Sequence, residues 1–571
     1  MKKLINSPRD VVPDMLRGLC ATDERLRLIP SLNVIVRSDY EAVRERGEVA
    51  LISGGGAGHE PAHAGYVGAG MLTAAVTGAV FTSPSVDAVL GAIRLVTGEA
   101  GCLLIVKNYT GDRLNFGLAA SIARSEGLQV EMVLVDDDVA LDVGRSRAGA
   151  RGLAGTVFVH KLAGAAAAAG KPLAEVAAMA AQFVGGIGTM GVALSSCTNP
   201  SAGKPGFELG ADEIEYGLGI HGERGASRET IAEASAIADR LIDRIVAELK
   251  LAGGERVALM VNGLGGTPPS ELAIMAGGAL AAARRHGLAV ERVSCGTLLS
   301  ALEMAGCSLT LARIDDERLA LLDQPVEAPA WVGLTCPAAS AYELGEPQAR
   351  LAKGQGDLVA LSQAQQDLLR STIAGVAKAL IAAEPGLTDL DSIVGDGDLG
   401  ISLARGSEAV LEGIDAVDCT HPARAANDLS TIVRRAVGGT SGPLYAAFLL
   451  AAAQSMREAS SPASLADWAQ AMASGAAAIT ELGGAKRGDS TMLDAIIPAA
   501  EAMQEAAAAG SSTSEMLARA LAAARAGTQS TADINPRVGR ASYVGDRAVG
   551  HIDPGAQAVT VWLEAIGNLV P

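Results

Sequence analysis

The sequence is poor in aromatic residues, in basic charge and in paired cysteines. Phe, Trp and Tyr make up only 3% of the 571 residues, so the core must be built from Ala, Leu, Val and Ile. The formal net charge is −18, and no basic stripe is present to neutralise phosphates, which argues against a nucleic-acid partner. The seven cysteines are scattered and form no Cys-x-x-Cys pair. We therefore expect neither a structural zinc site nor a secreted disulfide framework.

Export and membrane signals are also weak. The basic opening of the chain reaches Arg9 and Asp10 without an apolar stretch, so no secretory signal is expected. Residues 62–86 are uncharged and long enough to span a bilayer, but glycines, His63 and Pro84 interrupt them. We interpret this segment as buried loop and strand, and expect a cytoplasmic protein with no membrane partner.

The length of the chain predicts more than one domain. In residues 1–330, short β-branched runs that end in glycine-rich or polar turns alternate with alanine-rich helical stretches. This pattern is typical of an α/β fold with a mostly parallel sheet. The expected strands are 49–53, 103–107, 132–135, 156–159 and 257–261, and the expected helices are 162–183 and 270–285.

The composition and the hydrophobic pattern change after residue 330. Residues 331–356 contain prolines and little periodicity, which predicts an interdomain linker. In residues 357–571, apolar and small residues recur at three-and-four spacing, so this second domain is expected to be all-α. Residues 558–563 are ambiguous between strand and helix. The expected helices are 368–383, 402–413, 427–436, 444–459, 464–482, 491–509 and 514–529.

Three motifs of the first domain carry candidate ligand-binding residues, and the first two directly follow expected strands. Ser53–Pro61 (SGGGAGHEP) brings backbone N–H groups close to a ligand and adds His59. Lys107–Asp112 (KNYTGD) offers donors and a candidate base, and 217–225 (GLGIHGERG) places His221 between glycines. Open α/β sheets bind ligands at the carboxyl ends of their strands. Taken singly, each motif could also be an ordinary glycine-rich or salt-bridged turn.

Two features of the second domain suggest a metal and a phosphate. Asp391, Asp396 and Asp398 lie in DSIVGDGD and can converge on a hard cation such as Mg²⁺, although an Asx-rich turn fits the same pattern. Glycine with Ser or Thr ahead of a helix, as in VGGTSGP at 437–443, commonly holds phosphate on backbone N–H groups. Arg540 or Arg487 could supply a guanidinium to the same phosphate.

Taken together, the motifs resemble those of the single-chain dihydroxyacetone kinases over nearly the whole chain. SGGGxGHEP, FTSP, KNYTGD, GIHGE, DxxxxDGD, GGTSGP and GRASY…DPGA occur in that family's order. The resemblance implies a ketose-binding domain of two α/β subdomains at 1–330 and an ATP-binding eight-helix barrel at 357–571. It implies a homodimer, and ATP as the direct phosphate donor, since no phosphocarrier domain is present.

The resemblance also implies roles for individual residues. The family's histidine matching His221 holds the ketone as a hemiaminal, the aspartate matching Asp112 is the base for the hydroxyl that is phosphorylated, and the histidine matching His59 assists by hydrogen bonding. The positions implied to bind the ketose are Gly56, Ser83, Lys107, Asp112 and His221.

In the second domain, the resemblance implies two Mg²⁺ ions on Asp391, Asp396 and Asp398, bridging the nucleotide phosphates. Ala57 replaces the family's usual serine and Leu399 its usual His or Thr, which leaves the ketose open between dihydroxyacetone and a tetrulose such as erythrulose. The positions implied to contact ATP are Leu399, Gly400, Ile401, Ser402, Thr440, Ser441, Gly483, Met492, Arg540, Asp553, Pro554 and Gly555.

Three other functions are weighed against the kinase. Some relatives split FAD to AMP and cyclic FMN in the same nucleotide domain, and nothing in the sequence excludes this lyase activity. Some ketose-domain relatives are non-catalytic sensors, but that function predicts damage to the base or to the metal aspartates, which are intact. A fatty-acid kinase component would share only the helical domain.

Overall fold

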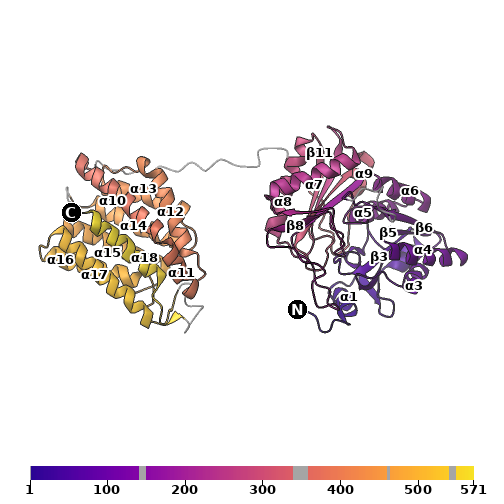
Figure 1. Ribbon diagram of the computed structural model, residues 1–571, viewed down its shortest axis with the longest axis horizontal. Helices are drawn as coiled ribbons and strands as arrows, with labels where there is room; N and C mark the ends of the chain where they lie inside the picture. Colours follow the sequence, from indigo (N-terminus) through magenta and orange to yellow (C-terminus); the bar gives the residue numbers. More distant parts are fainter. Residues whose placement is uncertain (1, 141–148, 339–357, 460–462, 539–547, 571) are drawn as a thin grey trace. The chain divides into compact units, whose positions relative to one another are not determined.

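The computed structural model describes residues 2–140, 149–338, 358–459, 463–538 and 548–570 (Figure 1). The chain forms two compact units, Met1–Gly345 and Glu346–Pro571. Most of the expected linker, residues 339–356, lies outside the described ranges. No helix within those ranges is long and apolar enough to cross a membrane.

The first sheet of the N-terminal unit has six strands in the order β1-β2-β4-β3-β5-β6. Its four strands β4, β3, β5 and β6 are parallel, whereas β1 and β2 pair antiparallel. The strands expected at 49–53, 103–107 and 132–135 are confirmed as β3, β5 and β6. The strand bounds are β1 (Leu26–Ile29), β2 (Val34–Arg37), β3 (Ala50–Ala57), β4 (Ala74–Val80), β5 (Cys102–Lys107) and β6 (Val130–Val135).

The second sheet has the order β11-β10-β12-β7-β8-β9. Only β10 and β11 are parallel, so the expectation of a mostly parallel sheet is wrong here. The central strands are buried on both faces, and such apolar runs look alike in either direction. The strand bounds are β7 (Ile187–Ala193), β8 (Glu213–Tyr216), β9 (Ser227–Thr230), β10 (Arg256–Gly263), β11 (Ala289–Gly296) and β12 (Gly306–Arg313).

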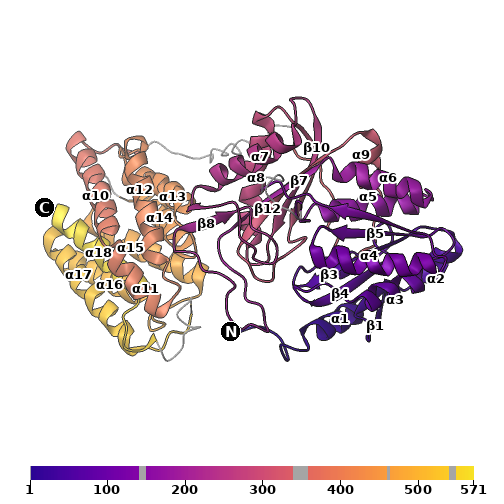
Figure 2. The ribbon, with the colours of Figure 1, turned by 45° about the vertical axis from the view of Figure 1, so that its right-hand side comes forward.

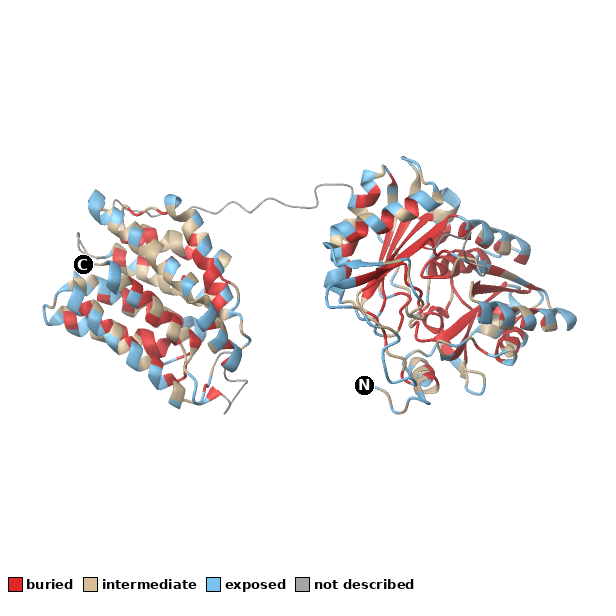
Figure 3. Ribbon diagram, in the orientation of Figure 1, coloured by how far each residue is buried: buried red, intermediate tan, exposed pale blue. Residues whose placement is uncertain are grey.

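Helices cover both sheets and fill the space between them. α3 and α4 share a core with one face of the first sheet, and α7 and α8 share another with the second sheet. The other faces meet in a third core around α5, which joins Ile105 of the first sheet to Met260 of the second. Figure 3 shows the strands of this unit mostly in the buried colour. The helix bounds are α1 (Val11–Thr22), α2 (Tyr40–Glu45), α3 (Val86–Val96), α4 (Thr110–Ser125), α5 (Thr156–Ala168), α6 (Leu173–Val184), α7 (Ala234–Leu249), α8 (Pro269–Arg285) and α9 (Asp316–Leu322).

The region around α5 differs from the prediction in two ways. The expected strand 156–159 is the first turn of α5, and the expected single helix 162–183 is two helices, α5 and α6, separated at Gly170. Every residue of α5 from Thr156 to Ala167 is buried. Because the helix has no polar face, it lacks the amphipathic period, and its β-branched start resembles a strand.

In the described part of the second unit, eight helices form a closed ring (Figure 2). Each of α10 and α12–α18 packs against the next, α18 packs back against α10, and α11 lies against α12 and α18. The ring encloses an apolar cavity of about 670 Å³. All seven expected helices are confirmed, and residues 558–563 belong to a helix. The bounds are α10 (Gln363–Ala382), α11 (Glu384–Val394), α12 (Leu399–Gly413), α13 (Pro422–Ala436), α14 (Ser441–Arg457), α15 (Leu465–Gly483), α16 (Leu493–Ala508), α17 (Thr513–Ser530) and α18 (Pro554–Leu569).

Candidate active site

His221 lies in the loop between β8 and β9 and is fixed by a carboxylate two residues later. Its Nδ1 is 2.8 Å from Glu223 Oε1, and its backbone N–H donates to Glu223 Oε2 at 3.0 Å. Burial acts to raise the pKa of Glu223, but the hydrogen bond and charge of His221 outweigh it and lower the pKa to about 2. An ionised carboxylate only accepts, so Nδ1 carries a hydrogen, and in the neutral imidazole Nε2 is the nitrogen with the lone pair. This tautomer suits a nucleophile.

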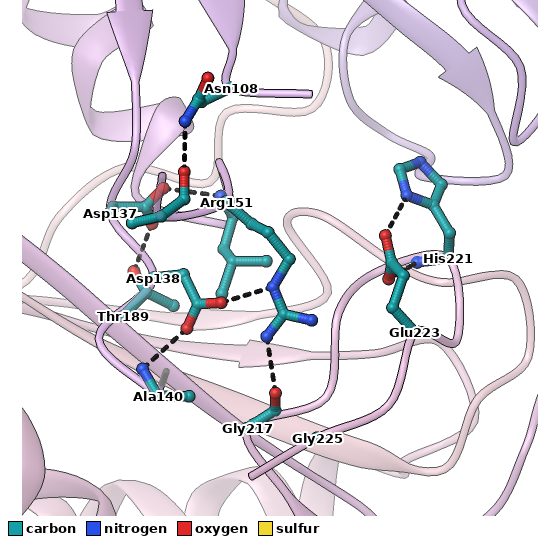
Figure 4. A network of polar contacts seen from close by, with 12 residues as sticks. Asn108, Asp137, Asp138, Ala140, Arg151, Thr189, Gly217, His221, Glu223 and Gly225 are labelled. Atoms are coloured by element: carbon teal, nitrogen blue, oxygen red, sulfur yellow. Dashed lines mark hydrogen bonds and ion pairs between the residues drawn. The ribbon is translucent and has the colours of Figure 1, made fainter. Parts of the chain in front are cut away.

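The loop that carries His221 is anchored by a buried ion pair (Figure 4). Arg151 donates from Nε to Asp138 at 2.6 Å and from its terminal nitrogen to the Gly217 carbonyl oxygen at 2.7 Å. Asp138 also accepts the backbone N–H of Ala140. The first residue of the loop is therefore held to the inner part of the unit, which restricts where His221 can lie.

His59 follows β3 directly and is completely buried. Its Nδ1 is 2.9 Å from the Ser300 carbonyl oxygen, which can only accept, so Nδ1–H is the donor. Burial, then the charges of Lys107 and His221, hold the pKa of His59 well below its ordinary value, so the ring is neutral. Its Nε2 has no hydrogen-bond partner among the described residues and remains an acceptor.

Aromatic rings surround the imidazole of His221. The ring centres of His59, Phe81 and Tyr109 are 4.8, 5.3 and 4.6 Å from it. Phe81 also stacks on His59, and its φ of 58° marks a tight turn. A Cβ on Gly56 would lie 2.5 Å from the backbone nitrogen of Thr82, so only glycine lets the end of β3 approach this turn.

Lys107 and Asp112 both approach the backbone of Gly55. Lys107 ends β5 and Asp112 lies in the first turn of α4, and both are buried. A Cβ on Gly55 would lie 3.1 Å from Lys107 Nζ and 3.7 Å from Asp112 Oδ2. Asp112 Oδ1 has no hydrogen-bond partner in the described part of the chain. The carboxylate thus has an oxygen available to take a proton from a ligand.

The predicted ketose-site residues therefore lie in two adjoining groups, one around His221 and one around Asp112. Ser83 joins the second group, since its Oγ would lie 2.6 Å from a Cβ on Gly111 at the start of α4. Their roles remain predictions. Sequence reasoning missed Glu223 and Tyr109, although the glutamate of GIHGE was a visible signal.

The three predicted metal ligands converge in the second unit. Asp391, Asp396 and Asp398 each offer an oxygen, and the three oxygens lie within 4.8 Å of one another. Asp391 is a buried residue in the last turn of α11, and its Oδ2 accepts the backbone N–H groups of Asp398 and Leu399 at 2.9 and 3.0 Å. Three carboxylates are the donor set that Mg²⁺ prefers, so the residues fit the implied ion.

Several predicted nucleotide contacts lie at the starts of helices. Leu399 begins α12, Ser441 begins α14, and Met492 and Asp553 cap α16 and α18. Helix N-termini present unpaired N–H groups and positive dipole ends, which suits phosphate. Arg540 lies outside the described residues.

Some of these segments lie close to one another, and one of them, the start of α18, belongs to a helix that packs against α11. A Cβ on Gly555 would lie 3.7 Å from the backbone nitrogen of Met492, and one on Gly483 would lie 3.2 Å from Leu444 in the first turn of α14. Burial, with the nearby carboxylates of Asp494 and Asp391, raises the pKa of Asp553 to about 7. The start of α18 is thus close to Asp391.

Comparisons with known proteins agree with this arrangement. The Dak1 domain matches residues 17–330 and the DAK2 domain matches residues 393–568. Triokinase/FMN cyclase of Homo sapiens is 41% identical over 577 residues, covering 99% of this chain and 98% of its own length. Dihydroxyacetone kinase of Citrobacter freundii is 37% identical over 553 residues, covering 95% of this chain and 94% of its own.

A solved structure supports the fold over both units. The C. freundii dihydroxyacetone kinase in complex with AMP-PNP and Mg²⁺ matches with a TM-score of 0.67 and 34% identity, covering 99% of both chains. The α/β half followed by the helical half is the architecture that the sequence predicted. The chain belongs to the dihydroxyacetone kinase family.

Proposed function

We propose that the chain transfers the γ-phosphoryl group of ATP to a hydroxyl of a short-chain ketose, dihydroxyacetone or a tetrulose such as erythrulose. The observation that carries the proposal is an imidazole held through Nδ1, His221, in the same unit as Asp112, which has a buried oxygen without a partner among the described residues. Relatives named triokinase and dihydroxyacetone kinase, and a neighbour that holds AMP-PNP and Mg²⁺, support it. We assign ketose binding to residues 1–330 and ATP binding to residues 357–571.

The first step in this proposal binds the ketose covalently. Nε2 of His221 attacks the carbonyl carbon, a C–N bond forms, and the π pair of the carbonyl moves to oxygen. The new alkoxide takes up a proton from water, and Nδ1 gives up its proton to water by way of Glu223, so the hemiaminal is neutral. Glycerol has no carbonyl and cannot be held in this way.

The second step activates the hydroxyl. Asp112 takes the hydroxyl proton as the oxygen attacks the γ-phosphorus of ATP, the bond from that phosphorus to the bridging oxygen breaks, and ADP leaves. The ammonium of Lys107 stabilises the carboxylate before transfer. Nε2 of His59 accepts a hydrogen bond from the ketose. Asp391, Asp396 and Asp398 would hold Mg²⁺, and the chemistry that the ion would supply is neutralisation of phosphate charge.

The test is a coupled ADP-release assay with Mg·ATP. The acceptors are dihydroxyacetone, glyceraldehyde, both erythrulose enantiomers and glycerol. We expect turnover with a ketose and none with glycerol. If no acceptor releases ADP from a folded preparation, the kinase assignment is wrong.

A second activity is favoured by the name of the human relative, which joins triokinase to FMN cyclase. The same helical unit would then split FAD to AMP and cyclic FMN. Incubation with FAD and Mn²⁺, followed by chromatography, tests this. Absence of cyclic FMN would leave the kinase as the activity of this chain.

We also infer a homodimer and a cytoplasmic location from the family resemblance. Light scattering on the purified chain tests the first, and fractionation of the source cells tests the second. A monomeric mass at assay concentration would contradict the dimer.

A further inference from the structure

Lys107 is one end of a chain of buried polar side chains in the N-terminal unit, and the proposed chemistry uses none of the others. Lys107 Nζ is 3.0 Å from His63 Nε2, and His63 Nδ1 is 2.9 Å from His160 Nε2. Ser53 Oγ lies 3.3 Å from the same Nδ1. All four side chains are buried, and His160 comes from the apolar helix α5. Buried polar groups in a core that apolar residues could fill suggest a function.

The hydrogens of this chain can be placed from Ser53. Its hydroxyl donates to the Ile105 carbonyl oxygen at 2.7 Å, so towards His63 its oxygen can only accept. Nδ1 of His63 therefore carries the hydrogen, and Nε2 accepts from Lys107. His160 Nε2 also accepts from His63 Nδ1, which leaves the hydrogen of His160 on its own Nδ1. That nitrogen has no partner within the described ranges, so the chain ends there.

Both imidazoles are neutral, and each accepts a hydrogen bond at Nε2. Burial, then the charge of Lys107, holds the pKa of His63 well below its ordinary value, and the same causes lower the pKa of His160 to about 3. A proton on Lys107 therefore does not pass to either ring near neutral pH. The Lys107 ammonium thus donates a hydrogen bond to His63 but has no counter-ion in His63 or His160.

The charges that face Lys107 lie on other elements. Burial lowers its pKa, and carboxylates act against this in the order Asp112 of α4, Glu60 after β3, Asp137 after β6 and Glu223 of the 217–225 loop. The remaining titratable neighbours are the neutral rings His59, His63 and His160. Among these carboxylates, Asp112 does most to raise the pKa of Lys107.

We propose that His63 and His160 are positioning residues, which hold the Lys107 ammonium beside Gly55, where its charge acts on Asp112, through an uncharged hydrogen-bond chain. A carboxylate in place of His63 would form an ion pair with the Lys107 ammonium and weaken its effect on Asp112. A neutral imidazole accepts a hydrogen bond from the ammonium without competing for its charge. The inference rests on the proposed function, in which Asp112 is the base.

The first test replaces His63 and follows kcat and KM for the ketose from pH 6 to 10. His63→Leu removes the acceptor for Lys107. Hydrogen bonding to the charged form favours that form, so its loss lowers the pKa of Lys107 further. We expect kcat to fall about 10- to 100-fold, KM to change less, and the alkaline limb of the kcat profile to move down by about one pH unit.

Matched variants separate positioning from packing. His63→Gln offers an amide oxygen to Lys107 and should restore the alkaline limb, and His160→Leu should shift it in the same direction by less. Lys161→Met, next to His160 on α5, removes a buried amine that donates to the Leu321 carbonyl oxygen instead. This control should leave the profile in place. Unchanged kcat and an unmoved limb in folded His63→Leu would overturn the proposal.

A second measurement uses the unsubstituted chain and does not depend on the stability of the variants. ¹⁵N NMR of histidine-labelled protein should show His63 and His160 as neutral Nδ1–H tautomers from pH 6 to 9. An Nε2–H tautomer at His63 would mean that it donates to Lys107, which contradicts the proposal. An unmoved pH profile in His63→Leu, or an Nε2–H tautomer at His63, would refute this inference alone if the unsubstituted chain still phosphorylates a ketose. Absence of turnover in the unsubstituted chain would refute the proposed function itself.

Discussion

Glu223→Gln is the substitution that most directly tests how His221 is prepared for the ketone. Glu223 accepts two hydrogen bonds from His221. Its Oε1 accepts from Nδ1–H, and its Oε2 accepts from the backbone N–H. Glutamine keeps a single carbonyl oxygen and turns an NH₂ group towards the other donor. At least one of the two hydrogen bonds must therefore be lost.

The expected change in KM follows from the loss of one hydrogen bond. A hydrogen bond to a charged group contributes about 1.5–3 kcal/mol, and about 2 kcal/mol corresponds to a roughly 30-fold change in an equilibrium constant. Hemiaminal formation is a binding step, so we expect KM for the ketose to rise about 30-fold while kcat at saturation changes less. His221→Ala should raise KM further and weaken discrimination against glycerol.

The assay is ADP release against ketose concentration, with NMR of carbonyl-¹³C-labelled dihydroxyacetone as a direct probe. The bound carbonyl signal should be lost with the unsubstituted chain and persist with the variant. Glu229→Gln is the control, because Glu229 is exposed on β9 and pairs with Arg240. An unchanged KM in Glu223→Gln, with the carbonyl signal still lost, would refute the role of Glu223 in fixing the tautomer.

Three further substitutions test the rest of the site. Asp112→Asn should lower kcat about 10²- to 10⁴-fold, as loss of a positioned base does, and near-normal turnover would remove Asp112 from the mechanism. Asp396→Ala, like chelation of Mg²⁺ by EDTA, should abolish the heat of Mg·ATP binding in calorimetry, and retained binding would contradict the metal site. Gly56→Ala puts a Cβ 2.5 Å from a backbone nitrogen, so urea denaturation should show a loss of about 1–3 kcal/mol together with weaker ketose binding. An unchanged midpoint would show that the 81–84 turn can move.

The sequence predicted the elements that carry a local pattern. β3, β5 and β6 are apolar runs that end in glycine or polar turns, and the helices of the second unit keep three-and-four spacing. Strand direction in the second sheet has no such local signature, because β10 and β12 are buried on both faces. The direction of each strand depends on its neighbours in the sheet, and these depend on how α5, α7 and α8 pack.

The same distinction applies to the site. His221, Asp112 and the three metal aspartates stand in glycine-rich motifs, so their residue types and spacing could be identified from the sequence. The contact of Lys107 with His63 joins residues 44 apart, and that of His63 with His160 joins residues 97 apart. No local pattern links them, and only the fold brings them together.

The position of His160 shows why α5 was difficult to predict and why it matters. A helix that is apolar on every side gains most from burying only apolar side chains, since an unsatisfied buried nitrogen costs about 1–3 kcal/mol. His160 leaves Nδ1 without a partner in the described part of the chain, although a leucine there would avoid that cost. The compensating contact is with His63, and through it with the ammonium beside Asp112. If that contact served packing alone, His160→Leu should stabilise the fold and leave catalysis unchanged; if it serves the pocket, the variant should be as stable or more so, and slower.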